Sequence, residues 1–329
     1  MAALVFVLNC IDMDDYAAAP THAACAAQLV RSPEGCRVMD VLLQLYESTQ
    51  LGESRAAHES GDVIVAIVHR LLVAGLVQEL LAGLAPRSDS SRVSASHVAL
   101  LRVCAECIHM RLDVLKSGNS DARRHACDTD RAALWMRSTL PLVDMLVELA
   151  NDAEAAMRAV RQDGAADVGG LVRTHLALLA LLESLTAAVM CGQELVAARI
   201  DSSGDTELLG ALRSRRVAAA CVSLLREAHT FMPAQSPFAV TDGTLPPPEG
   251  HAASSLHTAP RPPPDRPALP HLKRAVLQLL GALAFCPPPR RASHDVRAFQ
   301  DLVRELGGLV DVLNLTMLDE HNPCTLVAT

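Results

Sequence analysis

Apolar positions along the chain recur with the 3.6-residue period of an α-helix. The clearest case is SPEGCRVMDVLLQLYES, in which Ser32 is a candidate N-cap and Pro33 suits the first helical position. Four aliphatic residues follow at i, i+3, i+4 and i+7, which predicts one buried stripe: Val38, Val41, Leu42 and Leu45. This segment is therefore expected to be an amphipathic helix that buries the stripe.

The same period predicts further helices along the first two thirds of the chain. They are expected within 62–84, 95–116, 129–161, 169–199 and 205–229. Breaks are predicted where Gly, Pro, Ser and Asn gather, at Gly61, 86–88, 117–119, Gly164 and 202–204. No alternation of β-branched or aromatic residues with polar ones competes with these helices.

Three shorter helices are predicted near the C-terminal end. The first buries five aliphatic residues at helical spacing: Leu272, Val276, Leu279, Leu280 and Leu283. A second runs from Ser293 to Leu306, and a third, 309–315, follows a Gly307-Gly308 stop that permits positive φ. Three helices with a glycine break before the last are typical of an armadillo-like unit.

Composition narrows the fold class to all-α. The 329 residues are 50% hydrophobic but only 2% aromatic, so small aliphatic side chains of the kind that fill helix–helix interfaces supply the apolar mass. This length allows one elongated array or two domains. Many helices joined by short polar breaks predict an armadillo-like α-solenoid, although the repeat period is blurred. One fragment is self-similar, because LVFVLNCIDMDD (4–15) aligns without gaps over LVDVLNLTMLDE (309–320).

The composition changes abruptly between Met232 and Pro270. This stretch holds most of the chain's 19 prolines and no apolar stripe, so a Pro-rich disordered or flexible insertion is expected there. The predicted organisation is a helical region 1–231, a linker 232–270 and a C-terminal helical unit 271–329. PxxP-like pieces in 259–270 leave open a recognition role beside that of a plain spacer.

The C-terminal unit resembles a known family. KRAVLQLLGALAF followed by QDLVRELGGLVDVLNLTMLDEHNP is similar to the C-terminal domain of the ataxin-10 family over residues 271–323. The matching residues are Lys273, Arg274, Gly281, Leu283, Gln300, Asp301, Val303, Arg304, Glu305, Gly307, Gly308, Leu313, Asn314, Asp319, Glu320, Asn322 and Pro323. The resemblance implies a cytoplasmic armadillo-like scaffold that takes part in cytokinesis, hence in cell division, through protein partners. The family motif residues are expected to be structural.

The chain departs from the family pattern after Asn322-Pro323. The family continues with a Phe-Ile-Arg-Glu-Trp-Ala helix that packs on the preceding ones, whereas this sequence continues CTLVAT. We expect a truncated product, of which an inactive form is one alternative. The apolar face of helix 309–315 is therefore expected to be partly exposed.

Charge and targeting signals point to a cytoplasmic protein without nucleic-acid partners. The net charge is −8 and the pI about 5.9, which is not the balance of a nucleic-acid binder. Uninterrupted apolar stretches stop well short of the ~20 residues of a membrane span, and the N-terminus lacks a basic n-region. No span is therefore expected, and the ten cysteines are expected to be mostly thiols in a reducing compartment.

One constellation could bind a metal. Cys104 and Cys107 form a CxxC with His109 nearby, and His125 and Cys127 follow downstream. A zinc- or copper-linked protein or metalloenzyme centred on Cys104, Cys107, His125 and Cys127 is the alternative hypothesis. The CxxC nevertheless lies within an apolar helical run without a turn to converge the thiols, which favours buried structural cysteines.

No catalytic motif is present, so a non-enzymatic protein without a cofactor is expected. The sequence has no Gly-x-Ser-x-Gly, no P-loop and no GxGxxG after a strand. Ser293 after Arg290-Arg291 and Ser236 before Pro237 fit kinase sites, so phosphorylation is a further possibility. Partner identity and oligomeric state are not predicted.

Overall fold

The computed structural model describes most of the chain as packed helices. It covers residues 2–11, 19–50, 55–85, 93–117, 138–163, 167–197, 203–233, 267–285 and 294–314. The helices are α1 (Ala2–Cys10), α2 (Ala19–Arg31), α3 (Pro33–Gln50), α4 (Arg55–Val73), α5 (Val77–Gly83), α6 (Ala95–Lys116), α9 (Leu140–Asp163), α10 (Val168–Ala197), α11 (Ser203–Leu212), α12 (Arg215–Phe231), α13 (Leu272–Ala284), α14 (His294–Glu305) and α15 (Gly308–Asn314). Every element within these ranges is helical, which confirms the all-α prediction.

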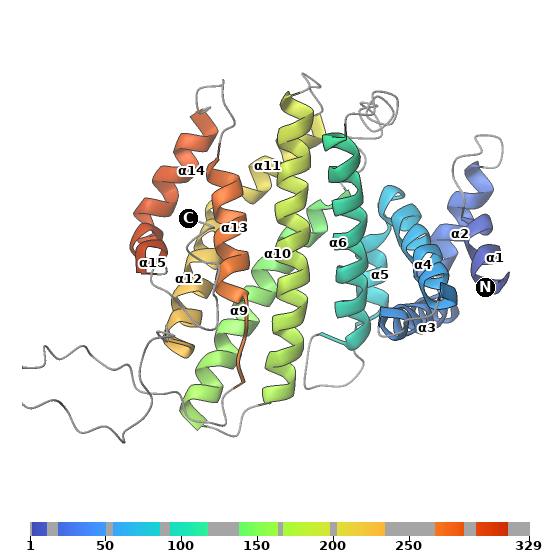
Figure 1. Cartoon of the computed structure of the whole chain (residues 1–329), viewed down its shortest axis with the longest axis horizontal. Coiled ribbons are helices and arrows are strands. Elements are labelled where there is room, and N and C mark those ends of the chain that lie inside the picture. The colour runs from blue at the N-terminus through green and yellow to red at the C-terminus, as the bar shows by residue number, and fades with distance from the viewer. Residues whose placement is uncertain are drawn as a thin grey trace, which may run out of the picture.

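The helices are arranged broadly along the longest axis of the molecule, from the N-terminal to the C-terminal ones (Figure 1). The blue N-terminal helices lie at one end and the red helices α14 and α15 at the other, with α6 and α10 between them. Helix α10 packs against α6, α9 and α13, and α12 packs against α9, α13, α14 and α15. Elements from the first and the last third of the chain therefore share one packed interior.

Helix α10 is the most deeply enclosed element. Leu178, Leu181 and Leu185 are fully buried. Its stretch Val168–Leu195 is long and apolar enough to cross a membrane, a feature that the search for uninterrupted apolar runs missed because Glu183 divides it. A core helix has the same properties, and 72% of the tested window is buried inside the structure. The bent pair 58–73 and 77–83 passes the same test of length and composition.

Helix α3 begins as predicted but buries a different face. Gly35 N–H donates to Ser32 Oγ at 3.0 Å, so Ser32 caps the helix. Of the predicted stripe only Leu42 is buried, whereas Val41 is 61% exposed and Val38 and Leu45 are also exposed. The core face consists instead of Met39, Leu42, Leu43 and Tyr46. The stripe prediction is wrong because both faces of α3 carry aliphatic residues, and tertiary packing selects one of them.

Three other boundaries differ from the sequence prediction. The expected helix 62–84 is two helices, α4 and α5, bent by 114° where Gly75 adopts φ +73°. The expected break at Gly61 is wrong, since Gly61 is buried within α4 and packs closely on Thr49 of α3. The expected helix 205–229 divides into α11 and α12 at Ser214, whose side chain caps α12.

The two described ends that flank the Pro-rich segment are held together. Lys273 is fully buried and its Nζ donates to the Met232 carbonyl at 2.6 Å. Leu269 N–H donates to Met232 Sδ at 3.1 Å, and His175 Nε2 donates to the Pro270 carbonyl at 3.0 Å. The Pro-rich prediction itself falls on residues 234–266, which lie outside the described residues. The five aliphatic residues predicted to be buried in α13 are all buried.

A buried imidazole joins α5 to α6. His97 Nε2 donates to the Leu81 carbonyl at 2.9 Å, and its Nδ1 accepts from Ser94 N–H at 3.2 Å in a capping box. Burial lowers the pKa of His97 below its ordinary value of 6.5, against an opposing effect of the Leu81 hydrogen bond. Burial likewise lowers the pKa of His175. Each ring is therefore held neutral by the fold.

We predict that acid destabilises the chain through these imidazoles. Below pH 6.5 the unfolded state binds protons that the folded rings resist, so the free energy of unfolding falls by up to ~1.4 kcal/mol per pH unit for each ring. In urea titrations from pH 8 to 5, His97→Gln is expected to show a shallower pH dependence than the parent chain. Ser94→Ala, the control, removes the cap at a cost of ~1 kcal/mol but keeps the slope. Identical slopes for His97→Gln and the parent would contradict the assignment.

Candidate functional site

An apolar groove opens between the last three helices. Its volume is about 310 Å³. The lining residues are Leu277, Leu280, Gly281 and Ala284 of α13, Gln300, Val303 and Arg304 of α14, and Leu309 and Val312 of α15. Arg304 is the only ionisable residue among them. Such a groove, with an aliphatic floor and one cation at the rim, suits an apolar segment better than a polar substrate.

Helix α12 fixes α15, which forms one wall of the groove. Gly307 ends the turn after α14 with φ +79°, a conformation that favours glycine. A Cβ on Gly308 would lie 2.7 Å from Val222 Cγ2, so only glycine permits this approach of α15 to α12. Arg226 Nη2 donates to Asp311 Oδ2 at 2.8 Å and reaches the Leu306 carbonyl at 3.4 Å. The wall is therefore held in place by α12.

Large apolar side chains of α15 and of the residue after α13 are exposed. Leu309 is 48% exposed, Val310 61% and Leu313 56%, and Phe285 at the end of α13 is 53% exposed. The partial exposure of helix 309–315 predicted from the sequence is confirmed. Three of these side chains lie within one two-turn helix, and an exposed apolar helix face of this kind is typical of a binding surface.

The family motif residues of α14 make structural contacts around the groove. Gln300 Nε2 donates to the Ala284 carbonyl at 2.8 Å and so ties α14 to the end of α13. Arg304 Nη1 donates to Asp301 Oδ1 at 2.6 Å, and Glu305 faces Arg215 of α12 at 3.6 Å. The last described motif residue, Asn314, ends α15, whereas Asp319, Asn322 and Pro323 lie outside the described residues.

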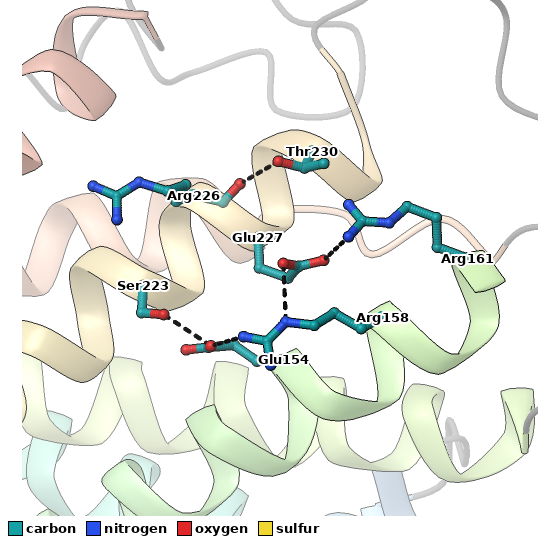
Figure 2. Close-up of polar contacts among 7 residues, drawn as sticks. All are labelled: Glu154, Arg158, Arg161, Ser223, Arg226, Glu227 and Thr230. Carbon is teal, nitrogen blue, oxygen red and sulfur yellow. Dashed lines mark hydrogen bonds and ion pairs between the residues drawn. The ribbon is translucent and has the colours of Figure 1, made fainter.

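A charged network that sequence reasoning missed joins α9 to α12 (Figure 2). Glu154, only 5% exposed, accepts at Oε2 from Arg158 Nη2 at 2.6 Å and from Ser223 Oγ at 2.8 Å. Arg158 Nε donates to Glu227 Oε2 at 3.3 Å. Arg161 Nη2 lies 3.2 Å from Glu227 Oε1 as an ion pair without hydrogen-bond geometry. The i, i+4 spacing of Glu154 and Arg158 was a signal, but nothing in the sequence pointed to α12 as their partner.

The network is electrically balanced and closes a helix interface. Two carboxylates face two guanidinium groups; the Arg158 side chain is 48% exposed, whereas Glu154 and Glu227 are largely buried. On the far side of α12, the guanidinium of Arg226 points away from this network (Figure 2). The network therefore locks α9 to α12 and offers no unbalanced charge for a substrate.

A second hollow of about 440 Å³ lies among α5, α9, α11 and α12. Arg216 Nη1 donates to Asp144 Oδ1 at 2.7 Å beside it, and both side chains are more than half exposed. An exposed ion pair of this kind contributes little to stability or to catalysis. The Arg216–Asp144 pair therefore does not mark this hollow as a candidate functional site.

Two of the four candidate metal ligands, Cys104 and Cys107, lie within the described residues, and both are in the hydrophobic core. Cys104 and Cys107 are buried in α6, and Cys107 Sγ contacts the Val65 carbonyl at 3.7 Å. Burial raises the pKa of the Cys104 thiol to about 12 and that of Cys107 well above its ordinary value. Thiolate, the form that binds metal, is therefore disfavoured at both positions.

The other candidate ligands do not join this pair in the described structure. His109 lies on the exposed face of α6, and His125 and Cys127 lie outside the described residues. Within the described ranges no three His, Cys, Asp or Glu side chains gather in a way that could hold a metal ion. The candidate phosphorylation sites, Ser236 and Ser293, also fall outside the described residues.

Comparison with known proteins gives no relative: no family model, no curated protein and no solved structure matches the chain. The similarity to the ataxin-10 family therefore depends on the motif residues within 271–323 alone.

We predict that the α9–α12 network stabilises the fold. Glu154→Ala removes the carboxylate that accepts hydrogen bonds from Arg158 Nη2 and Ser223 Oγ. Because the Arg158 side chain is 48% exposed and can be solvated, the free energy of unfolding is expected to fall by only ~1–3 kcal/mol. Asp301→Ala removes an exposed pair of the same 2.6 Å length and is the matched control, with an expected change below ~0.5 kcal/mol. Equal effects of the two variants in urea unfolding would refute this ranking.

We also predict that Cys104 and Cys107 are core thiols. In native protein at pH 8 they are expected to resist a thiol reagent while the exposed Cys25 reacts at once, because burial suppresses their thiolates. Elemental analysis should give the same metal content for the parent and for a Cys104→Ala/Cys107→Ala double variant. One zinc or copper per chain that disappears in the double variant would instead establish the metal hypothesis.

Proposed function

We propose that this chain is a non-enzymatic scaffold, an armadillo-like α-solenoid that binds protein partners through helix-lined surfaces. The observation that carries the proposal is the apolar groove of α13–α15, together with exposed Leu309, Val310 and Leu313 on α15. Helices that are arranged broadly along the long axis and share one interior support the solenoid arrangement.

The cellular role comes from the resemblance to the ataxin-10 family. It implies a cytoplasmic protein that takes part in cytokinesis. Two residues that carry the resemblance make contacts beside the groove: Gln300 with the Ala284 carbonyl and Arg304 with Asp301. The metal-linked alternative has weaker support, because its two described cysteines are buried thiols in α6.

We expect cells depleted of the protein to fail in cytokinesis and the groove to be needed for rescue. The parent chain should restore the normal fraction of binucleate cells, whereas Leu309→Asp/Leu313→Asp should not, because charge in an apolar contact abolishes burial. Both side chains are about half exposed, so the fold should survive, which circular dichroism and the melting temperature check. Val41→Asp is the matched control, since Val41 is 61% exposed on α3 at the opposite end.

The outcomes separate the parts of the proposal. Rescue by Leu309→Asp/Leu313→Asp at parental level would exclude the groove as the working surface. Depletion without any defect in division would exclude the cytokinesis role while leaving protein binding to be measured directly.

A further inference from the structure

The groove of α13–α15 is aliphatic inside and bordered by arginines. Arg304 of α14 is itself one of the lining residues. Arg297 precedes Arg304 by seven positions, which is two helical turns, so both lie on the same face of α14. On α13, Arg274 precedes the lining residue Gly281 by the same interval. Three arginines on two helices therefore border one apolar surface.

This border carries more positive than negative charge. The carboxylates beside it each face an arginine already: Asp301 faces Arg304, Glu305 faces Arg215 and Asp311 faces Arg226. Arg274 and Arg297 form no ion pair with any residue in the described ranges. Because the whole chain has a net charge of −8, a local excess of arginines is a distinct feature of this surface. Such an excess attracts a partner that carries carboxylates.

The walls of the groove favour a helical occupant over an extended one. All three walls are α-helices, whose backbone groups bond within each helix, so they present no strand edge to which an extended peptide adds. The side-chain amide of the lining residue Gln300 already donates to the Ala284 carbonyl. A helix satisfies its own backbone groups and inserts side chains at i, i+3 or i+4, and i+7 into a groove of this kind.

We propose that the groove of α13–α15 binds an acidic amphipathic helix of a partner protein. Its aliphatic stripe enters the groove, and carboxylates on both flanks of the stripe face Arg274, Arg297 and Arg304. Leu309 and Leu313 of α15, each about half exposed, add apolar surface to the contact. This inference rests on the proposed function, because it names the class of partner for the same groove.

Fluorescence anisotropy with designed peptides tests the charge match. The first peptide is a labelled helix of about five turns with leucines along one face and glutamates on both flanks, and the second has lysine in place of every glutamate. The parent chain is expected to bind the glutamate peptide at least ~tenfold more tightly, and high salt should reduce the difference. A glutamate peptide with two central prolines should lose this affinity, because proline breaks the helix.

Charge reversal on the chain identifies the contact. Arg274→Glu/Arg297→Glu is expected to prefer the lysine peptide, and its binding of that peptide shows that the variant is folded. Arg31→Glu/Arg37→Glu is the matched control, since it changes the net charge equally on α2 and α3 at the opposite end of the molecule (Figure 1). The control should keep the preference of the parent chain for the glutamate peptide.

Several outcomes would overturn the proposal. Equal affinity for the glutamate and lysine peptides, or no binding of either, contradicts the charge match. Undiminished binding of the proline peptide shows an extended occupant. A concentration-dependent dimer in light scattering that excess glutamate peptide does not dissociate shows a second copy in the groove.

The peptide assay and the cytokinesis assay fail separately. If Leu309→Asp/Leu313→Asp does not rescue division and the glutamate peptide does not bind the parent chain, the groove serves a partner of different chemistry and only the present inference is refuted. If the glutamate peptide binds and the same variant rescues division, the binding chemistry stands and the proposed cellular use of the groove is refuted.

Discussion

The burial of α10 is the constraint on which the rest of the structure depends. This helix is apolar around most of its circumference, so it needs neighbours on several sides, and α6, α9 and α13 provide them. Truncating one of its fully buried leucines, such as Leu181, would cost ~2–5 kcal/mol. Because α6 precedes α10 and α13 follows it by a long stretch of sequence, packing around α10 joins the two parts of the chain into one interior.

Helix α12 connects this core to the groove, because it packs on α9 and α13 and also positions α15. Most of the contacts that position α15 could not be predicted from sequence. The motif around Gly307 and Gly308 predicted a helix stop, and the exposure of α15 was expected because the sequence departs from the family pattern after Asn322-Pro323. The contacts that position α15 come from Val222 and Arg226, more than eighty positions away from their partners in sequence. Single positions on an amphipathic helix do not reveal which distant helix they will meet.

The fold class was predictable because periodicity and small aliphatic side chains both favour helices. The wrong predictions of helix boundaries and of the buried face of α3 have one cause: local sequence does not show which distant helix packs against a segment. A break was predicted at Gly61, yet Gly61 lies inside α4, where a Cβ would come within 3.3 Å of Thr49 Oγ1, and the turn occurs at Gly75 instead. On α3 both Val41 and Met39 lie on apolar faces, and only the neighbouring helices select Met39 for the core.

The junction at Met232 and Leu269 has a consequence for how this chain can change. These two residues are 37 positions apart, and Leu269 N–H donates to Met232 Sδ. The buried ammonium of Lys273 donates to the carbonyl of the same methionine. Since each doubling of a closed loop costs only ~0.6 kcal/mol, the sequence between these anchors can be exchanged or resized while α12 and α13 keep their docking. Changes in the sequence or length of the proline-rich stretch are therefore expected to leave the packing of the helical body intact.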